Sequence, residues 1–345
     1  MPRHPITDFL RTATGPILDV RAPAEYAQGH MPGARSLPLF TDEERARIGT
    51  TYKQVNPKKA VLLGLDFFGP KLRALVEEAQ RQAPGQEVRL HCWRGGMRSG
   101  AVQWLLELAG FQVNLLDKGY KEYRQWVLAE LARPRQLRVL GGYTGSGKTA
   151  VLAALAARGE PVLDLEGLAN HQGSSFGALG QPPQPTQEQF ENNLAAALVA
   201  LPDDGAPIWV EDESRMIGSL AVPPTFFAQL QAAALVVLEV PREARVQYLA
   251  ADYGRHDAGE LAAAVLRLRK RLGGLVTKEA LAAIAEDDMT RMVELVLAYY
   301  DKTYGHGLAE RPAVVVAAEG TDAAANAALV LAAVQPAPTP DVLRS

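Results

Sequence analysis

The stretch from Gly142 to Thr149, with the sequence GYTGSGKT, constrains the fold more than any other part of the chain. It fits the pattern G-x-x-x-x-G-K-[ST], in which glycines let the backbone curl around phosphate oxygens. The pattern requires a strand before it and a helix after it. Residues 137–141 predict a short strand, and the Ala/Leu-rich residues 150–158 predict a helix that ends at Gly159. The sequence therefore predicts a phosphate-binding loop in an α/β domain.

Each part of this loop has an expected role. Main-chain N–H groups and the start of the helix attract the anion, while Lys148 adds a mobile charge and Thr149 a hydroxyl that suits Mg²⁺. The residues expected to bind phosphate are Gly142, Thr144, Gly145, Ser146, Gly147, Lys148 and Thr149.

Composition limits the class of protein. The 345 residues are 48% hydrophobic, which is ordinary for a soluble chain and enough for two cores. The net charge of −3 means that a nucleic acid would need a local basic patch. Cys92 is the only cysteine, and no apolar run is long enough to span a membrane. We expect a cytoplasmic protein that lacks a secretory leader.

A second site is predicted around Cys92. Residues 88–91 read as a strand that ends at Cys92, and a helix is expected over residues 98–108. Because strands and helices alternate, a parallel sheet is expected, and such sheets bind ligands at the carboxyl ends of their strands. A small core cysteine is the alternative, but two glycines and two arginines beside it disfavour that interpretation.

The chemistry expected of this loop is nucleophilic. The loop amides, the helix start and the side chains of Arg94 and Arg98 favour a negatively charged sulfur on Cys92, which attacks sulfur, selenium or phosphorus centres. The other residues of the donor loop are Trp93, Gly95, Gly96, Met97 and Ser99.

The predicted organisation is one parallel-sheet domain over residues 1–132, a linker over 133–136, a P-loop NTPase-like parallel-sheet domain with additional helices over 137–334, and a disordered tail over 335–345. Within the first domain, residues 41–70 look polar and irregular, with a helix only over 41–47.

Several further residues are weaker candidates. Asp212, Glu211 or Asp164 is a candidate acid or Mg²⁺ ligand, with Glu213 as a rival, although an acid at a strand end is often only a helix cap. The Gly/Ser loop with His171, Ser174 and Ser175 is expected to line a substrate pocket or else to be merely flexible.

The first domain resembles the rhodanese family over residues 4–130. The resemblance is carried by Asp19-Val20-Arg21, Glu25-Tyr26, residues 29–34 and the Cys92 loop. That family moves sulfur as a cysteine persulfide. Here five residues separate Cys92 from Arg98 instead of the usual four, as in the related phosphatases. A wider ring suits a tetrahedral, phosphate-sized anion, so the donor attacked by Cys92 is expected to carry phosphate. Asp19 and Arg21 are expected to pair and brace the sheet.

Three more stretches, residues 164–171, 173–177 and 209–215, resemble bacterial tRNA 2-selenouridine synthases when taken with the Cys92 loop. The resemblance implies a wobble 2-thiouridine in tRNA as substrate. Its sulfur is geranylated by geranyl diphosphate, and selenium from selenophosphate then replaces the S-geranyl group. Cys92 is implied as the selenium carrier, and the P-loop as the diphosphate site.

The same resemblance implies the partners. These are tRNA and a selenophosphate-producing enzyme, with no membrane and no tightly bound cofactor; geranyl diphosphate and selenophosphate are co-substrates, and Mg²⁺ is a candidate ion. The candidate tRNA contacts are basic residues, although any one of them could be a solvated charge. They are Arg242, Arg245, Arg267, Lys270 and Arg271, with Arg255 and Lys278 beside them. Trp93, Tyr143 and Trp209 are expected either to stack on a base or to pack in a core.

Two other functions fit the motifs. One is a phosphatase–kinase fusion, in which Cys92 forms a phosphocysteine and the P-loop binds ATP or GTP. The other is a nucleotide-gated sulfur carrier or scaffold without catalysis of its own.

Overall fold

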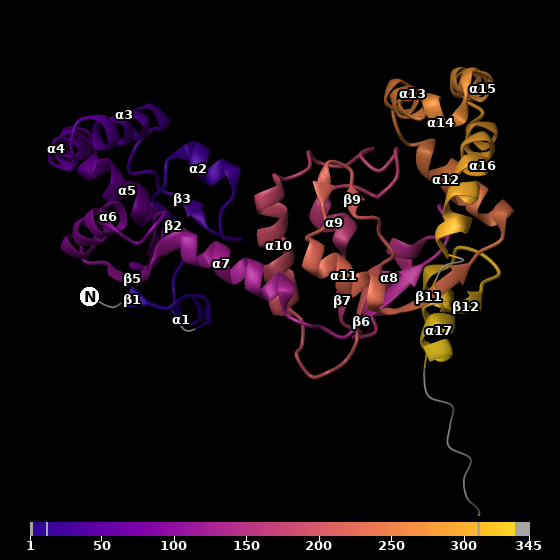
Figure 1. Cartoon of the computed structure of the whole chain (residues 1–345), viewed down its shortest axis with the longest axis horizontal. Helices are drawn as coiled ribbons and strands as arrows, with labels where there is room; N and C mark the ends of the chain where they lie inside the picture. Colours follow the sequence, from indigo (N-terminus) through magenta and orange to yellow (C-terminus); the bar gives the residue numbers. More distant parts are fainter. Residues whose placement is uncertain (1–2, 12, 309–310, 335–345) are drawn as a thin grey trace, which may run out of the picture. The chain divides into compact units, whose positions relative to one another are not determined.

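The computed structural model describes residues 3–11, 13–308 and 311–334, so the expected tail at 335–345 lies outside the described residues. The chain divides into two compact units, each built on a five-stranded parallel sheet (Figure 1). The first unit comprises Met1–Leu131 and Thr186–Ala196, and the second comprises Ala132–Pro185 and Ala197–Ser345. The expected fold class, α/β with two parallel sheets, is confirmed.

The sheet of the first unit places Cys92 beside its centre. The strand order is β1-β5-β4-β2-β3, with all pairs parallel. Asp19 is in register with His91, so β2 and β4 end side by side and Cys92 follows directly. The bounds are β1 (Arg3–His4), β2 (Ile17–Asp19), β3 (Arg35–Ser36), β4 (Glu87–His91) and β5 (Gln112–Leu116).

The helices of the first unit include two within residues 41–70, where the sequence predicts only a helix over 41–47. Residues 41–70 are not irregular but form a packed pair, α3 and α4, which begin at capping residues Thr41 and Asn56. α3 buries none of its residues, so its composition lacks the apolar stripe that signals a helix. The helices are α1 (Ile6–Arg11), α2 (Pro23–Gln28), α3 (Asp42–Gln54), α4 (Pro57–Phe68), the short 3₁₀ helix η1 (Gly69–Lys71), α5 (Leu72–Gln82), α6 (Met97–Leu108) and α7 (Gly119–Ala132).

The first half of α10 (Gln187–Ala200) packs within the first unit, although its position in the chain places it after the P-loop. The hydroxyl of Tyr120 donates to Glu188 at 2.8 Å and accepts from Asn192 at 2.7 Å. Arg124 of α7 donates to Asn192 at 2.6 Å. These buried contacts are long-range, and no sequence motif marks them.

The sheet of the second unit has the order β12-β11-β6-β8-β7, with the P-loop strand at its centre. Its strands are β6 (Leu137–Gly141), β7 (Val162–Leu163), β8 (Ile208–Glu211), β11 (Ala234–Glu239) and β12 (Ala313–Ala317), and β9 (Met216–Ile217) and β10 (Leu220–Ala221) form a separate antiparallel pair. Its helices, besides the end of α10, are α8 (Lys148–Ala156), α9 (Leu165–Ala169), α11 (Pro224–Ala232), α12 (Arg242–Tyr253), α13 (Ala258–Arg267), α14 (Arg269–Leu272), α15 (Gly274–Ala285), α16 (Met289–Leu308) and α17 (Ala323–Val334).

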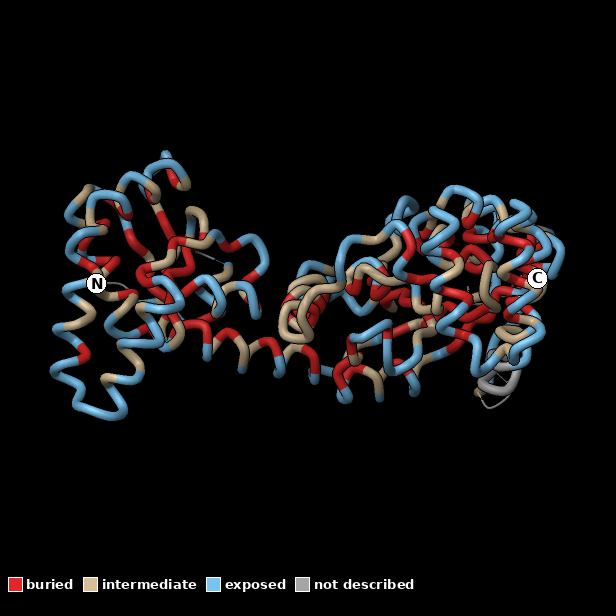
Figure 2. The backbone as a smooth tube through the Cα atoms, turned by 90° about the horizontal axis from the view of Figure 1, so that it is seen from above, coloured by how far each residue is buried: buried red, intermediate tan, exposed pale blue. Residues whose placement is uncertain are grey.

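Two cores support the second unit. One lies between the sheet and helices α8 and α17, and includes Leu140, Val151 and Val236. The other joins α12, α13, α15 and α16 in a helical layer and includes Phe176. In both units the central strands are buried and the helices expose their outer faces (Figure 2).

A buried ion pair braces the first sheet, as the sequence predicts. Asp19 and Arg21 are 0% and 1% exposed, and the Arg21 Nη2 to Asp19 Oδ2 distance is 2.6 Å. Arg21 also donates to the carbonyl of Gly29 at 2.6 Å and lies 3.7 Å from the centre of the Tyr120 ring. The pair therefore ties the end of β2 to α7 and to the loop after α2.

Replacing Arg21 by leucine should lower the free energy of unfolding by about 3–5 kcal/mol, because the Asp19 carboxylate stays buried without its partner. Urea unfolding followed by circular dichroism measures this change. The control is Arg73→Leu, which removes an exposed pair with Glu77 and should leave the unfolding midpoint unchanged. Equal stability of Arg21→Leu and wild type would contradict the bracing role.

Candidate functional site

Cys92 lies at the carboxyl end of β4, where the sequence predicts it. The residue is 3% exposed, and its Sγ is 3.2 Å from the hydroxyl of Ser99 in the first turn of α6. The loop from Trp93 to Gly96 connects the two elements. Either group can be the donor in this contact, and the Ser99 hydroxyl also donates to the carbonyl of Gly96 at 3.3 Å.

The loop after Cys92 has free main-chain donors. Within the described residues, the N–H groups of Arg94, Gly95 and Gly96 donate to no protein acceptor. Gly119 lets α7 approach the loop, since its φ is +63° and a Cβ there would overlap the carbonyl oxygen of Cys92. Unpaired N–H groups at the start of a helix bind anions, so this loop is suited to a phosphate-like group.

The two arginines of the loop differ in their surroundings. Arg98 donates to Oε2 of Glu25 at 2.6 Å, whereas the side chain of Arg94 is exposed. Burial alone would raise the pKa of Glu25, but its contact with Arg98 lowers the value. The sequence did not identify Glu25 as this partner, because 73 residues separate the two.

Two of the remaining donor-loop residues, Trp93 and Met97, differ in how far they are buried. Trp93 is half-buried, with its ring centre 5.8 Å from that of Tyr120. Met97 begins α6 and is 70% exposed, so it faces away from the buried sulfur.

The P-loop has the expected strand, loop and helix, because β6 precedes it and α8 begins at Lys148. Within the described part of the chain, the N–H groups of Thr144, Gly145 and Gly147 donate to no protein acceptor. The Nζ of Lys148 donates to the carbonyl of Gly142 at 2.9 Å. The buried hydroxyl of Ser146 has no partner among the described residues. The loop is therefore a second cradle with unpaired polar groups.

Acidic side chains gather beside this second cradle. Thr149 donates to Oε2 of Glu166 at 2.8 Å, and burial together with Glu166 raises the pKa of Glu213, against the effect of Lys148. Glu211 is fully buried, and burial with Asp164 and Glu166 raises its pKa to about 8. The sequence assigned no site role to Glu166, although its place just after β7 puts it at the ligand-binding edge.

The other two predicted acids have protein partners. Asp212 pairs with Arg311 at 3.0 Å and also lines the cavity described below. Asp164 caps α9, because its Oδ1 accepts from the N–H of Gly167 at 2.7 Å. Among the described residues, no group of three or more His, Cys, Asp or Glu side chains is arranged to hold a metal ion. Mg²⁺ needs fewer protein ligands than that, so carboxylates near Thr149 still fit it.

A polar cavity of about 330 Å³ opens over the P-loop. Gln172, Gly173 and Ser174 line it together with Lys148 and Glu213, so the predicted substrate loop does lie at the P-loop. Tyrosines that the sequence analysis did not single out complete the wall; they are Tyr248, Tyr253 and Tyr300.

The loop residues differ in their roles. Ser175 donates its N–H to the hydroxyl of Tyr300 at 3.1 Å and accepts from Arg267 at 2.9 Å. His171 is partly buried, and burial together with Arg267 lowers its pKa. Its Nδ1 has no hydrogen-bond partner in the described chain. Arg267 thus holds the loop.

The predicted tRNA contacts do not form one surface. Arg245 is 5% exposed, and its guanidinium donates to Asp301 at 2.7 Å and to the carbonyl of Thr144 at 3.2 Å. Its guanidinium carbon also lies 5.0 Å from the centre of the Tyr143 ring. Arg245 therefore supports the P-loop, and its charge is paired inside the unit. Arg242 is exposed at the start of α12.

The remaining candidate tRNA contacts lie on two short helices. The segment 258–272 is two helices, α13 and α14, which meet at the buried Leu268. Lys270 and Arg271 are exposed on α14, and Arg267 ends α13. Trp209 is fully buried and donates to Glu160 at 3.2 Å, so it belongs to the core and does not stack on a base.

Comparisons with known proteins match two domain families to successive parts of the chain. A rhodanese-like domain family matches residues 8–125, and the family described as the tRNA 2-selenouridine synthase AAA domain matches residues 135–332. The tRNA 2-selenouridine synthase of Marinobacter nauticus is 37% identical over 89% of this chain and 92% of its own length. Those of Shewanella piezotolerans and Hydrogenovibrio crunogenus are each 37% identical, over 84% and 86% of this chain and 87% and 90% of their own lengths. In the described residues, no helix is both long and apolar enough to cross a membrane.

Glu211 predicts a pH dependence of stability. Its pKa is about 8 in the folded chain against an ordinary value of 4.5, so between these pH values the folded state holds a proton that the unfolded state has lost. Stability should therefore fall as pH rises from 5 to 8, by up to about 1.4 kcal/mol per pH unit. Urea unfolding in EDTA should show this fall for wild type and a smaller one for Glu211→Gln. Parallel pH profiles of the two proteins would contradict a buried, protonated Glu211.

Proposed function

We propose a two-step reaction for this chain, which belongs to the family of tRNA 2-selenouridine synthases. In the first step, the sulfur of a wobble 2-thiouridine in tRNA takes the geranyl group of geranyl diphosphate. In the second step, selenium from selenophosphate replaces the S-geranyl group and gives 2-selenouridine. The observation that carries this proposal is the presence of two loops, each with unpaired N–H groups, at the carboxyl ends of two parallel sheets.

The P-loop suits the first step. The thiocarbonyl sulfur attacks the first carbon of the geranyl chain, the carbon–oxygen bond breaks, and diphosphate leaves with the electron pair. The free N–H groups of Thr144, Gly145 and Gly147 and the charge of Lys148 would stabilise the leaving diphosphate. The new thioether makes the sulfur a better leaving group at the uracil carbon.

A divalent cation fits the same place. Burial and the nearby Glu166 raise the pKa of Glu213, and a cation beside these two carboxyl groups would favour the charged form of Glu213. Thr149, Glu166 and Glu213 are the residues that would hold Mg²⁺. Bound there, the ion would add positive charge to the diphosphate site.

The Cys92 loop suits the second step. Selenophosphate is a tetrahedral anion, which matches the free N–H groups of Arg94, Gly95 and Gly96. Cys92 would carry the selenium, with Ser99 beside its sulfur and Arg98 at the edge of the loop. The Cys92 thiolate would attack the selenium of selenophosphate, and phosphite would leave with the electron pair of the selenium–phosphorus bond. The perselenide would then attack the uracil carbon, the carbon–sulfur bond breaks and geranylthiolate leaves. A thiol reductant would finally cleave the sulfur–selenium bond, which releases 2-selenouridine and regenerates Cys92.

The tRNA would meet the exposed basic residues Arg242, Lys270 and Arg271, whereas Arg245 is withdrawn from this set because it is buried. Since tRNA and a selenophosphate-producing enzyme are its partners in this proposal, the chain would work in the cytoplasm.

Cys92→Ser should abolish selenation and leave geranylation intact, because serine is a much weaker nucleophile than a thiolate and the P-loop is unchanged. Mass spectrometry of digested tRNA measures both products. Accumulation of S-geranyl-2-thiouridine is the expected result, and selenouridine formed at the wild-type rate would contradict the carrier role.

Lys148→Ala should slow geranyl transfer by about a hundredfold or more, because the developing charge on diphosphate loses a donor. The internal control is selenation of an RNA that already carries S-geranyl-2-thiouridine, which the variant should still perform. Unchanged transfer would place the diphosphate elsewhere.

A further inference from the structure

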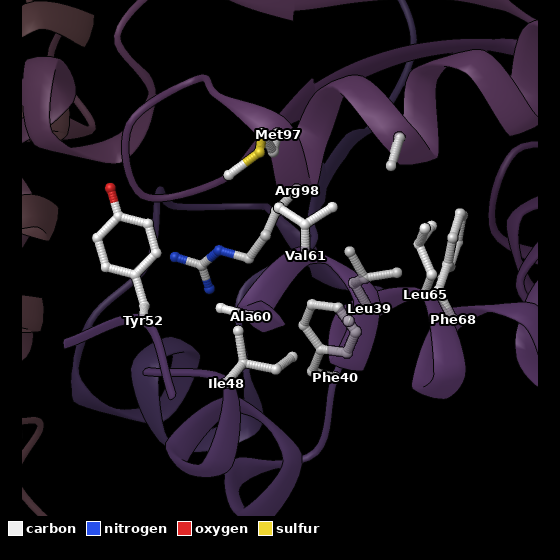
Figure 3. Close-up of a pocket in the computed structure, with 12 residues that line it drawn as sticks. Leu39, Phe40, Ile48, Tyr52, Ala60, Val61, Leu65, Phe68, Met97 and Arg98 are labelled. Atoms are coloured by element: carbon white, nitrogen blue, oxygen red, sulfur yellow. The ribbon is translucent and has the colours of Figure 1, made fainter. Parts of the chain in front are cut away.

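An apolar pocket lies in the first unit, between the α3–α4 pair and the start of α6 (Figure 3). Its volume is about 210 Å³. The wall is formed by α3, α4 and α6 and by the segment before α3, and it includes Tyr52, Ala60, Val61, Leu65, Phe68 and Met97. Neither the geranyl transfer at the P-loop nor the selenium transfer at the Cys92 loop involves this pocket in the reaction proposed above.

The wall is apolar but has one charged group. Among the described residues that line it, Arg98 is the only charged one, and Figure 3 shows its guanidinium between Tyr52 and Val61. Arg98 is held in place by Glu25. The charge of Arg98 is thus already paired, and the rest of the pocket suits a hydrocarbon chain.

The apolar side chains at this pocket are open to water. Val61, Leu65 and Met97 are 41%, 56% and 70% exposed. A cluster of exposed apolar residues around a concave site indicates a binding surface, because a free surface of this kind is otherwise unfavourable in water.

The pocket is next to the reactive sulfur in the chain and in space. Met97 and Arg98 begin α6 and line the pocket, and the following residue, Ser99, places its hydroxyl 3.2 Å from the Sγ of Cys92. The first turn of α6 thus has the pocket on one side and Cys92 on the other. A ligand chain in the pocket would bring an attached group to the Cys92 loop.

The size of the pocket fits a short isoprenoid chain. A closed apolar cavity of about 150 Å³ holds benzene, and this open pocket of about 210 Å³ is larger. A geranyl chain has about ten carbons, and each buried carbon adds favourable apolar contact.

We propose that this pocket binds the geranyl chain of S-geranyl-2-thiouridine and so presents the uracil carbon to Cys92. The inference rests on the proposed function and extends it, because it assigns the second substrate its own specificity site. The geranyl chain binds in this pocket while it is attached to the RNA, and it leaves the pocket as geranylthiol. Geranyl diphosphate, by contrast, reacts at the P-loop of the second unit. The pocket would give the thioether a binding advantage over free 2-thiouridine.

The test uses the full-length protein and two anticodon stem-loop RNAs, one with S-geranyl-2-thiouridine and one with S-methyl-2-thiouridine. Fluorescence anisotropy gives Kd for each without selenophosphate. Wild type should bind the geranyl RNA at least about tenfold more tightly, since most of the chain is missing from the methyl RNA. The variant Val61→Asn/Leu65→Asn should lose most of this preference.

The control is Leu62→Asn. Leu62 lies on the same helix and is 62% exposed, but it does not line the pocket, so this variant should keep the preference. Thermal melts check folding, and the substituted positions are exposed in both variants. A full preference retained by Val61→Asn/Leu65→Asn would overturn the pocket assignment.

Two further outcomes separate the claims. If the double variant instead raises KM for geranyl diphosphate and keeps the RNA preference, the pocket holds the donor chain and the proposal is overturned. If wild type prefers the geranyl RNA but never converts it to selenouridine with selenophosphate, the proposed function fails while the chain-binding pocket stands.

Discussion

Unpaired main-chain N–H groups are the constraint on which this structure depends. Buried or half-buried amides normally find an acceptor, and those that do not are costly unless a ligand completes them. In the Cys92 loop and in the P-loop, consecutive amides are left without a protein acceptor in the described chain. Each loop therefore offers a group of N–H donors to an anion, at the carboxyl end of a central strand.

Parallel sheets explain why the two sites look alike and act differently. Both loops follow a central strand, β4 in the first unit and β6 in the second, and both lead into a helix. The first loop adds a sulfur nucleophile and few acids, so it suits transfer of an atom from a phosphate-bearing donor. The second adds Lys148 and a group of carboxylates, so it suits a departing diphosphate.

The apolar pocket connects these two chemistries. A hydrocarbon chain that is attached at one site must be recognised at the other, or the second step would accept any thioether. In our proposal, the exposed apolar side chains of α3 and α4 next to Cys92 provide that recognition. In this account, recognition of the geranyl chain gives specificity for the substrate, and the two phosphate-binding loops give reactivity.

The loops could be predicted from the sequence, because each motif fixes both its residues and the strand and helix beside it. The pocket could not, since the sequence indicates a helix only over residues 41–47, and α3 buries none of its residues and so lacks an apolar stripe. Long-range contacts were equally hidden: the pairing of Arg98 with Glu25 and the packing of α10 against α7 depend on residues far apart in the chain. Arg245 was predicted to contact tRNA because the sequence shows its charge, but the sequence does not show that the side chain is buried.

The most direct test of the two-site account is a stepwise incubation of the full-length protein with thiolated tRNA, followed by nucleoside mass spectrometry after each addition. Geranyl diphosphate alone should give S-geranyl-2-thiouridine, and later selenophosphate should convert it to 2-selenouridine. Selenouridine that forms equally fast when geranyl diphosphate is omitted would contradict the account.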